Sequence, residues 1–151
     1  RAHTVQQAAK ILLDAPRSGA HVFWLADPTE LREYETSPDH YGLRTPSHDA
    51  VCHTNHCLHD AHIQVQGEPC SESSAARLDT MQTLLDRTGM NVENVKEIFA
   101  DRSQGIHSIN RYAEDDQGTA TNAVFIAVPA KRCAYACRGP ADRGRWYELT
   151  F

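Results

Sequence analysis

The sequence predicts an α+β fold with mainly antiparallel sheets. Three observations lead to this fold class: a stretch with helical periodicity opens the chain, a hairpin pattern follows it, and two further helical segments precede three strand-like runs. Helices and strands are thus segregated, and the crossover helices that build a parallel sheet are missing. With 151 residues and 40% hydrophobic residues, we expect residues 1–151 to form a single domain.

The first half of the chain predicts one helix and one hairpin. Thr4 stands in the N-cap position before a run with apolar residues every three or four positions. Two strand-like runs then flank a short turn, as in a hairpin. The predicted elements are a helix at 5–13, strands at 21–26 and 31–36, a loop at 37–49, and an extended run at 50–60.

The second half predicts two helices and three strands. Ser73 or Ser74 begins a long helix that ends near Thr88, and Asn91 caps a shorter one. The remaining predicted elements are an irregular polar segment at 101–120 and strands at 121–128, 132–137 and 146–151. We assign to the sheet cores the residues Phe23, Trp24, Phe125, Cys133, Tyr135 and Cys137. We assign to solvated turns the acidic stretches 27–35 and 114–116.

The composition gives no support to binding of nucleic acid or of a membrane. The formal net charge is −5, whereas both kinds of partner favour a basic patch. No apolar run reaches the length of a transmembrane helix, and no signal-peptide pattern opens the chain. Five irregularly spaced cysteines favour reduced thiols, although one bridge stays open. We therefore expect a cytoplasmic protein.

The run from Ala50 to Asp60 concentrates side chains that can donate, accept, ligate or attack. If this run is extended, His53, Asn55 and Cys57 share one face. Asparagine is depleted in strands and belongs to turns or sites, and a fixed carboxamide can donate to an oxyanion. The residues alone leave Asn55 open as an oxyanion donor or as a turn-capping amide.

A His/Cys metal-binding module is a second interpretation of the same region. Imidazole and thiolate groups bind Zn²⁺ or a softer metal. However, no pairing here has the spacing of a zinc finger or of an H-E-x-x-H helix. We expect no metal and no cofactor, and keep the module as the alternative; its ligands would come from His48, Cys52, His53, His56, Cys57, His59 and His62.

Several short elements along the chain occur together in a known family. The most specific is His53-Thr-Asn-His-Cys-Leu58, which follows a hairpin that ends in Glu35-Thr-Ser-Pro38. The others are Ser73-Ser-Ala-Ala-Arg77, Ser108-Ile-Asn-Arg111, Thr121-Asn-Ala-Val124, Cys137-Arg-Gly-Pro140 and Trp146-Tyr-Glu-Leu149. Over nearly its whole length, the chain resembles the acyl-coenzyme A:6-aminopenicillanic acid acyltransferase family.

This resemblance implies an N-terminal-nucleophile hydrolase. Members of the family have a four-layer αββα sandwich, and autoproteolysis exposes a cysteine that forms a thioester with the acyl group. That cysteine lies well upstream of the His-Thr-Asn-His element, whereas residues 1–49 contain no cysteine. The resemblance therefore implies that residues 1–151 are the C-terminal portion, and that a companion polypeptide or upstream segment brings the nucleophilic cysteine.

The resemblance also assigns roles to individual residues. It makes Asn55 the oxyanion-stabilising amide, and we expect His53 and His56 to orient it through hydrogen bonds. Ser108 and Arg111 would contact the substrate or its carboxylate, with loop hydrogen bonding and a surface cation as the alternatives. The expected substrate is a small-molecule amide or thioester, with acyl-coenzyme A as a possible acyl donor. A non-catalytic family member that acts as a binding or regulatory subunit is the alternative function.

Overall fold

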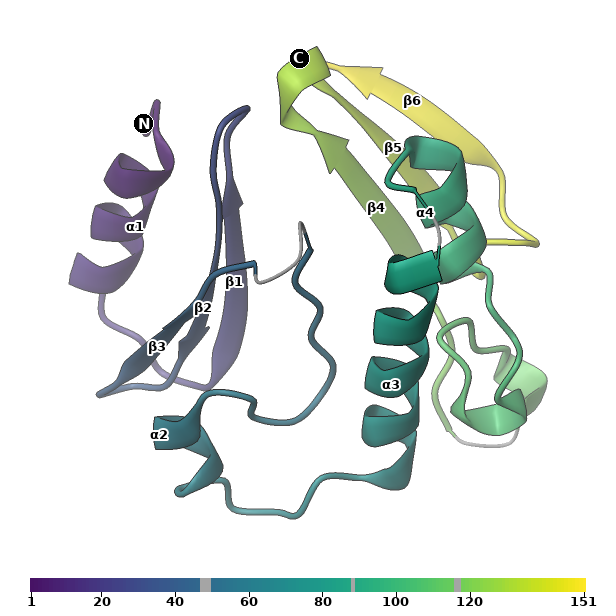
Figure 1. Cartoon of the computed structure of the whole chain (residues 1–151), viewed down its shortest axis with the longest axis horizontal. Coiled ribbons are helices and arrows are strands. Elements are labelled where there is room, and N and C mark those ends of the chain that lie inside the picture. Colours follow the sequence, from purple (N-terminus) through teal and green to yellow (C-terminus); the bar gives the residue numbers. More distant parts are fainter. Residues whose placement is uncertain (47–49, 88, 116–117) are drawn as a thin grey trace. The chain divides into compact units, whose positions relative to one another are not determined.

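The computed structural model describes residues 1–46, 50–87, 89–115 and 118–151. The chain divides into two compact units, Arg1–Cys70 and Ser71–Phe151, and each is described by itself. Each unit contains helices and one three-stranded antiparallel sheet (Figure 1). The predicted α+β class is therefore confirmed, and the single domain stays a prediction.

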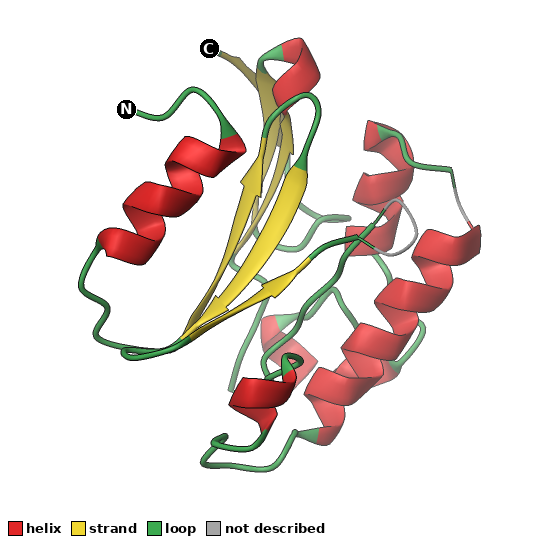
Figure 2. Cartoon of the chain, turned by 60° about the vertical axis from the view of Figure 1, so that its left-hand side comes forward, coloured by secondary structure: helices red, strands yellow, loops and turns green. Residues whose placement is uncertain are grey.

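The first unit consists of a sheet in the order β1-β2-β3 and two helices (Figure 2). Helix α1 begins behind Thr4, whose hydroxyl accepts a hydrogen bond from the N–H of Gln7. This helix and the β1–β2 hairpin confirm the sequence prediction. The elements are α1 (Val5–Asp14), β1 (His21–Ala26), β2 (Leu31–Thr36), β3 (Tyr41–Arg44) and α2 (Asp60–Ile63).

The chain after β2 differs from the prediction. The sequence predicts a loop over 37–49, but strand β3 lies within that range and pairs with β2. The run 50–60, described in full, contains no strand; it bends at Asn55 and His56 and enters α2 at its end. Because β1 and β3 occupy both sides of β2, the run cannot pair with that strand and binds its side chains instead.

Gly42 lets the 50–60 run approach the sheet. Gly42 pairs with Glu35 across β2 and β3, and an added Cβ would lie 2.1 Å from Cγ of His59. The ring of His59 therefore occupies the space that any larger residue at position 42 would need. The side chain of His59 also accepts a hydrogen bond from the N–H of Ala61 and caps α2.

The second unit places two helices before a sheet in the order β4-β5-β6. Its elements are α3 (Glu72–Arg87), α4 (Val92–Phe99), β4 (Ala123–Val128), β5 (Cys133–Arg138) and β6 (Trp146–Thr150), with 3₁₀ turns at Gly105–His107 (η1), Ala113–Asp115 (η2) and Pro129–Lys131 (η3). These elements confirm the predicted order; the predicted helix end at Thr88 lies outside the described residues. Within the part of the chain that the structure describes, no helix combines the length and apolarity needed to cross a membrane.

The two faces of the β4-β5-β6 sheet have different surroundings. On one face, Val124, Ile126 and Cys137 form a core with the partly buried Val95 and Phe99 of α4. The opposite face is apolar, and its large side chains are exposed. Adjacent positions on it carry Phe125, Ala136 and Tyr147 in one row and Ala127, the buried Ala134 and Leu149 in the next. Phe125 is 61% exposed, Tyr147 52% and Leu149 47%.

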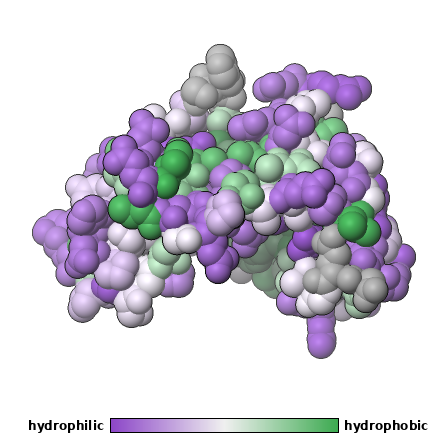
Figure 3. Space-filling view, turned by 90° about the horizontal axis from the view of Figure 1, so that it is seen from below, coloured by the Kyte–Doolittle hydropathy of each residue, from purple (hydrophilic) through white to green (hydrophobic). Residues whose placement is uncertain are grey.

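Two aromatic residues assigned to the sheet cores are therefore on the surface. Phe125 is one, and Trp24 of β1 is 54% exposed; alternation along a strand identifies two faces but not which of them is covered. Hydrophobic atoms, shown in green, also reach the surface in Figure 3. By contrast, Cys133 and Cys137 are buried as predicted.

We predict that Gly42→Ala destabilises the first unit by about 1–3 kcal/mol, because the new methyl group must displace the His59 ring or the β3 backbone. Urea denaturation of the two proteins measures the difference. Gly67→Ala is the matched control, since nothing lies within 4 Å of its added Cβ. Equal stability of Gly42→Ala and wild type would contradict the close approach.

Candidate functional site

Asn55 lies at the bend of the 50–60 run, and its side chain is exposed. The flanking histidines are partly buried and bind other groups. His53 places Nε2 3.1 Å from Oε2 of Glu35 and Nδ1 2.5 Å from the carbonyl oxygen of Thr54. Nδ1 of His56 forms a hydrogen bond of 3.2 Å with the Thr54 hydroxyl. The two histidines thus bind the backbone and side chains around Asn55.

Glu35 at the end of β2 is the residue of this region that the sequence analysis missed. Its carboxylate is 4% exposed. Oε2 accepts hydrogen bonds from the backbone N–H of Leu58 at 2.8 Å and of His59 at 3.2 Å. Oε1 lies 3.3 Å from Nδ1 of the buried His62. One carboxylate therefore contacts four residues of the segment 53–62.

The assignment of residues 27–35 to a solvated turn is wrong for the two acidic residues of β2. Glu33 is fully buried; it binds Nη1 of Arg44 at 2.7 Å and Nε1 of Trp24 at 2.9 Å. Glu35 is buried by the 53–62 segment. The sequence does indicate that the two side chains lie together: Glu33 and Glu35 are two positions apart, so both face the same side of the strand. Asp116 of the other acidic stretch lies outside the described residues.

Burial and hydrogen bonding shift the pKa of Glu35, and burial and the charge of Glu35 shift the pKa of Cys57. Burial by itself raises the pKa of Glu35, but the hydrogen bonds from the Leu58 N–H and from His53 outweigh it and hold the pKa below its usual value. Burial raises the pKa of the Cys57 thiol, and the negative charge of Glu35 raises it further. Cys57 is therefore kept as a neutral thiol beside an ionised carboxylate.

The cysteines and histidines of the described residues form no group of three or more metal ligands, counting aspartate and glutamate as well. His48, one of the candidate ligands, lies outside the described residues. The five cysteines all lie within the described residues, and none of them forms a disulfide. Cys52, Cys133 and Cys137 are buried, and burial raises the pKa of Cys137.

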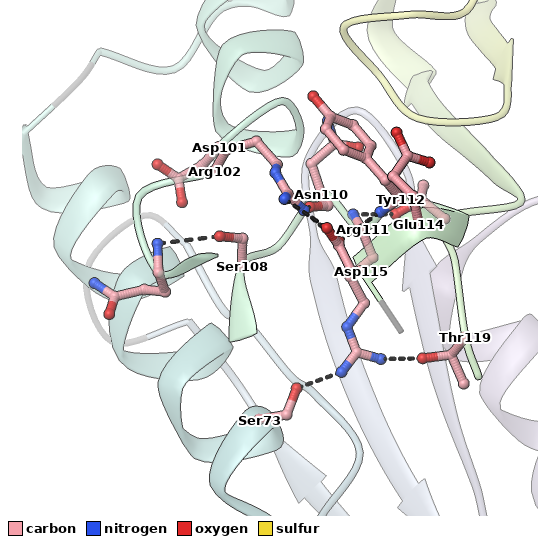
Figure 4. Close-up of polar contacts among 12 residues, drawn as sticks. Ser73, Asp101, Arg102, Ser108, Asn110, Arg111, Tyr112, Glu114, Asp115 and Thr119 are labelled. Carbon is pink, nitrogen blue, oxygen red and sulfur yellow. Dashed lines mark hydrogen bonds and ion pairs between the residues drawn. The ribbon is translucent and has the colours of Figure 1, made fainter. Parts of the chain in front are cut away.

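Ser108 and Arg111 lie in the second unit, in the loop between α4 and β4 (Figure 4). The Ser108 hydroxyl is fully buried and accepts a hydrogen bond of 3.0 Å from the N–H of Gln104. The Ser108 hydroxyl thus takes part in hydrogen bonding within the loop, which the sequence analysis gave as the alternative to a substrate contact. The Arg111 guanidinium donates to the hydroxyls of Ser73 on α3, at 2.5 Å, and Thr119, at 2.7 Å.

A polar frame fixes the loop that carries Ser108 and Arg111. The buried Asn110 donates to Oδ1 of Asp142 at 2.6 Å and accepts from the N–H of Ala141 at 3.1 Å. Arg102 binds both carboxylate oxygens of Asp115, at 2.5 and 2.8 Å. The arrangement holds the backbone of this loop in place, and the half-buried Arg111 extends from it to Ser73 and Thr119 (Figure 4).

The chain matches one protein-family model over almost its full length. The model is described as acyl-coenzyme A:6-aminopenicillanic acid acyl-transferase, and it matches residues 1–143. The resemblance drawn from the short sequence elements is thereby confirmed. No curated protein matches the chain.

The ion pair between Arg102 and Asp115 leads to a testable prediction about the pKa of Asp115. Arg102 is the main cause that lowers the pKa of Asp115 to about 2 from 3.8, so we expect Arg102→Gln to raise it toward 3.8. Since the folded pKa is the lower one, this ion pair stabilises the fold above pH 3.8 and stops doing so as the pH falls through about 2. NMR titration of the Asp115 carboxyl carbon measures the shift. Arg143→Gln, which removes the arginine bound to Glu114, is the control, and an equal shift there would contradict the assignment.

Proposed function

Because the chain belongs to the acyl-coenzyme A:6-aminopenicillanic acid acyltransferase family, we propose that it is part of an enzyme that transfers an acyl group through a cysteinyl thioester. The family match over residues 1–143 supports an acyltransferase role, as for the family in general. The identity of the nucleophile and the role of Asn55 are further steps, and each has its own support.

The nucleophilic cysteine comes, in this proposal, from a polypeptide segment outside residues 1–151. A cysteine attacks as its thiolate, and raised thiol pKa values at Cys57 and Cys137 work against that form. Cys52 and Cys133 are buried. Cys70 is exposed, but it follows the His53-Thr-Asn-His56 element, whereas the nucleophile that the family resemblance implies precedes that element. A terminal cysteine, in contrast, can use its own α-amino group as the base, because that group has a pKa near neutrality.

The proposed reaction has two steps. The incoming thiolate attacks the carbonyl carbon of an amide or of an acyl-coenzyme A thioester, and a tetrahedral oxyanion forms. Collapse of the oxyanion expels the amine or the coenzyme A thiolate, which takes up a proton, and leaves the acyl group on the cysteine. An amine or a water molecule then attacks this thioester, which restores the thiol.

Asn55 is proposed to donate a side-chain N–H to the oxyanion in both steps. An oxyanion donor has to be reachable by a substrate and has to be held by its neighbours. The exposure of Asn55 at a bend supports the first condition. The contacts of His53 and His56 on either side of it support the second. A donor of this kind acts without titrating, so the amide needs no pKa shift.

The four-layer αββα sandwich is also a proposal. Its support is the apolar face of the β4-β5-β6 sheet on which Phe125, Tyr147 and Leu149 are exposed. Helix α4 covers the opposite face. A sheet with one helix-covered face and one bare apolar face is what an inner layer of such a sandwich requires, because the bare face has to pack on a second sheet.

Asn55→Ala in the complete enzyme is predicted to lower kcat by roughly 100- to 1,000-fold, the usual loss for one oxyanion donor. Release of coenzyme A thiol from acyl-coenzyme A, with 6-aminopenicillanic acid as the trial acceptor, measures turnover. Asn55→Asp keeps the size of the side chain but replaces the donor by a negative charge, so it should be at least as inactive. Unchanged thermal unfolding of both variants is the control for folding.

Near-normal turnover of Asn55→Ala would refute the oxyanion role. A non-catalytic subunit, the alternative function, would show no thiol release in any form. It would also show no acylated cysteine on a companion polypeptide when the mixture is analysed by mass spectrometry.

Arg111 is proposed to bind a carboxylate of the acceptor. Burial and the positive charge of Arg111 lower the pKa of the neighbouring Arg77, which is the electrostatic environment that attracts an anion. We predict that Arg111→Gln raises KM for 6-aminopenicillanic acid by roughly 10- to 100-fold, the loss expected for one charge-assisted hydrogen bond. The methyl ester of the acceptor is the control: its KM should not change. An equal rise for acid and ester would contradict the carboxylate contact.

A further inference from the structure

We infer that Glu35 is the positioning residue of the candidate site: its buried carboxylate holds the segment 53–62 on the β1-β2-β3 sheet and thereby fixes the bend that carries Asn55. The inference deepens the proposed function and rests on it for the role of Asn55. Glu35 is the first residue of the Glu35-Thr-Ser-Pro38 element, but the resemblance assigns it no role. The role is inferred from the contacts of its two carboxylate oxygens.

The carboxylate holds the chain on both sides of Asn55. His53 binds it two residues before the bend, at 3.1 Å, and the N–H groups of Leu58 and His59 bind it three and four residues after, at 2.8 and 3.2 Å. A bend whose two ends meet at one acceptor cannot open without breaking one of these bonds. The position of Asn55 relative to the sheet therefore depends on Glu35.

Glu35 is itself rigidly held. It lies on β2, the middle strand of the sheet, where it pairs with Val22 of β1 on one side and Gly42 of β3 on the other. The absence of a side chain at Gly42 lets His59 lie directly over the sheet beside the carboxylate. A site held by a central strand is better fixed than a site held only within its own loop.

The site needs a carboxylate and not merely a polar side chain. Oε2 faces three donors, from His53, Leu58 and His59, and a carboxylate is an acceptor only. A glutamine could turn its single oxygen toward these donors, but hydrogen bonds to a neutral oxygen are weaker than those to an ionised one. Replacement by an amide therefore loosens the segment while it keeps the size of the side chain.

Glu33 offers a matched comparison on the same strand. It faces the same side of β2 as Glu35 and is fully buried. Its carboxylate, however, binds Arg44 and Trp24, neither of which belongs to the segment 53–62. Loss of either charge should weaken the fold, but only loss of the Glu35 charge should release the segment.

Amide hydrogen exchange on the 151-residue chain tests this difference without any substrate. In Glu35→Gln, exchange at Leu58 and His59 should accelerate roughly 10- to 100-fold, while the β1 and β2 amides stay protected. Glu33→Gln should leave Leu58 and His59 at the wild-type rate. Glu35→Asp keeps the charge on a shorter side chain, and we expect it to fold and to give an intermediate rate.

The complete enzyme supplies the second measurement. Misplacing an oxyanion donor by about 1 Å can cost about 100-fold in rate, so Glu35→Gln should lower kcat by that order with little change in KM. Glu35→Asp should recover part of the loss, and Glu33→Gln should retain wild-type kcat.

Three results would overturn the inference: wild-type exchange at Leu58 and His59 in Glu35→Gln, equal acceleration in Glu33→Gln, or accelerated exchange in Glu35→Gln with unchanged kcat. Failure of the proposed function would show itself elsewhere, as normal turnover in Asn55→Ala. The exchange rates of the Glu35 variants do not depend on that result, so the two failures are distinguishable.

Discussion

The first unit depends on the accommodation of a negative charge inside it. A carboxylate removed from water is costly unless hydrogen bonds replace its hydration. At Glu35 that replacement comes from backbone N–H groups and histidines of a segment with no strand partners. The charge and the segment therefore stabilise each other: the segment gains a fixed path across the sheet, and the carboxylate gains its donors. The candidate catalytic amide lies on that path.

Local sequence signals predicted most of the secondary structure. The N-cap at Thr4, the turn between β1 and β2 and the N-cap at Asn91 are read from short stretches, and the structure has helices or strands at each of them. Strand β3 was missed because it has only four residues, one of them Gly42, and lies between Pro38 and Pro46. Its pairing with β2 depends on the tertiary structure. The same limit applies to the run 50–60. Its path depends on hydrogen bonds from Leu58 and His59 to Glu35, which lies more than twenty positions earlier in the chain.

The candidate site was predictable only in part. The family match confirms the resemblance seen in the His-Thr-Asn-His element, whereas the oxyanion role that this resemblance assigns to Asn55 stays a prediction. The resemblance could not identify Glu35, because a glutamate in a strand is usually solvated and nothing nearby in the sequence marks it as buried. In the second unit, the buried position of Ser108 and the hydroxyl partners of Arg111 depend on a polar frame assembled from α3, the loop and the β5–β6 connection. Such a frame has no periodic signature.

The two buried acids of β2 also constrain how the first unit can fold. Glu33 finds its arginine eleven positions later, and Glu35 finds its amide donors twenty-three and twenty-four positions later. The isolated β1–β2 hairpin would have to keep both carboxylates in water, so its inner face cannot dehydrate by itself. Dehydration of that face and docking of the 53–62 segment must therefore occur together. Part of the cooperativity of the unit therefore comes from paired charges and donors, and the segment that supplies the donors of Glu35 also carries the amide proposed for chemistry.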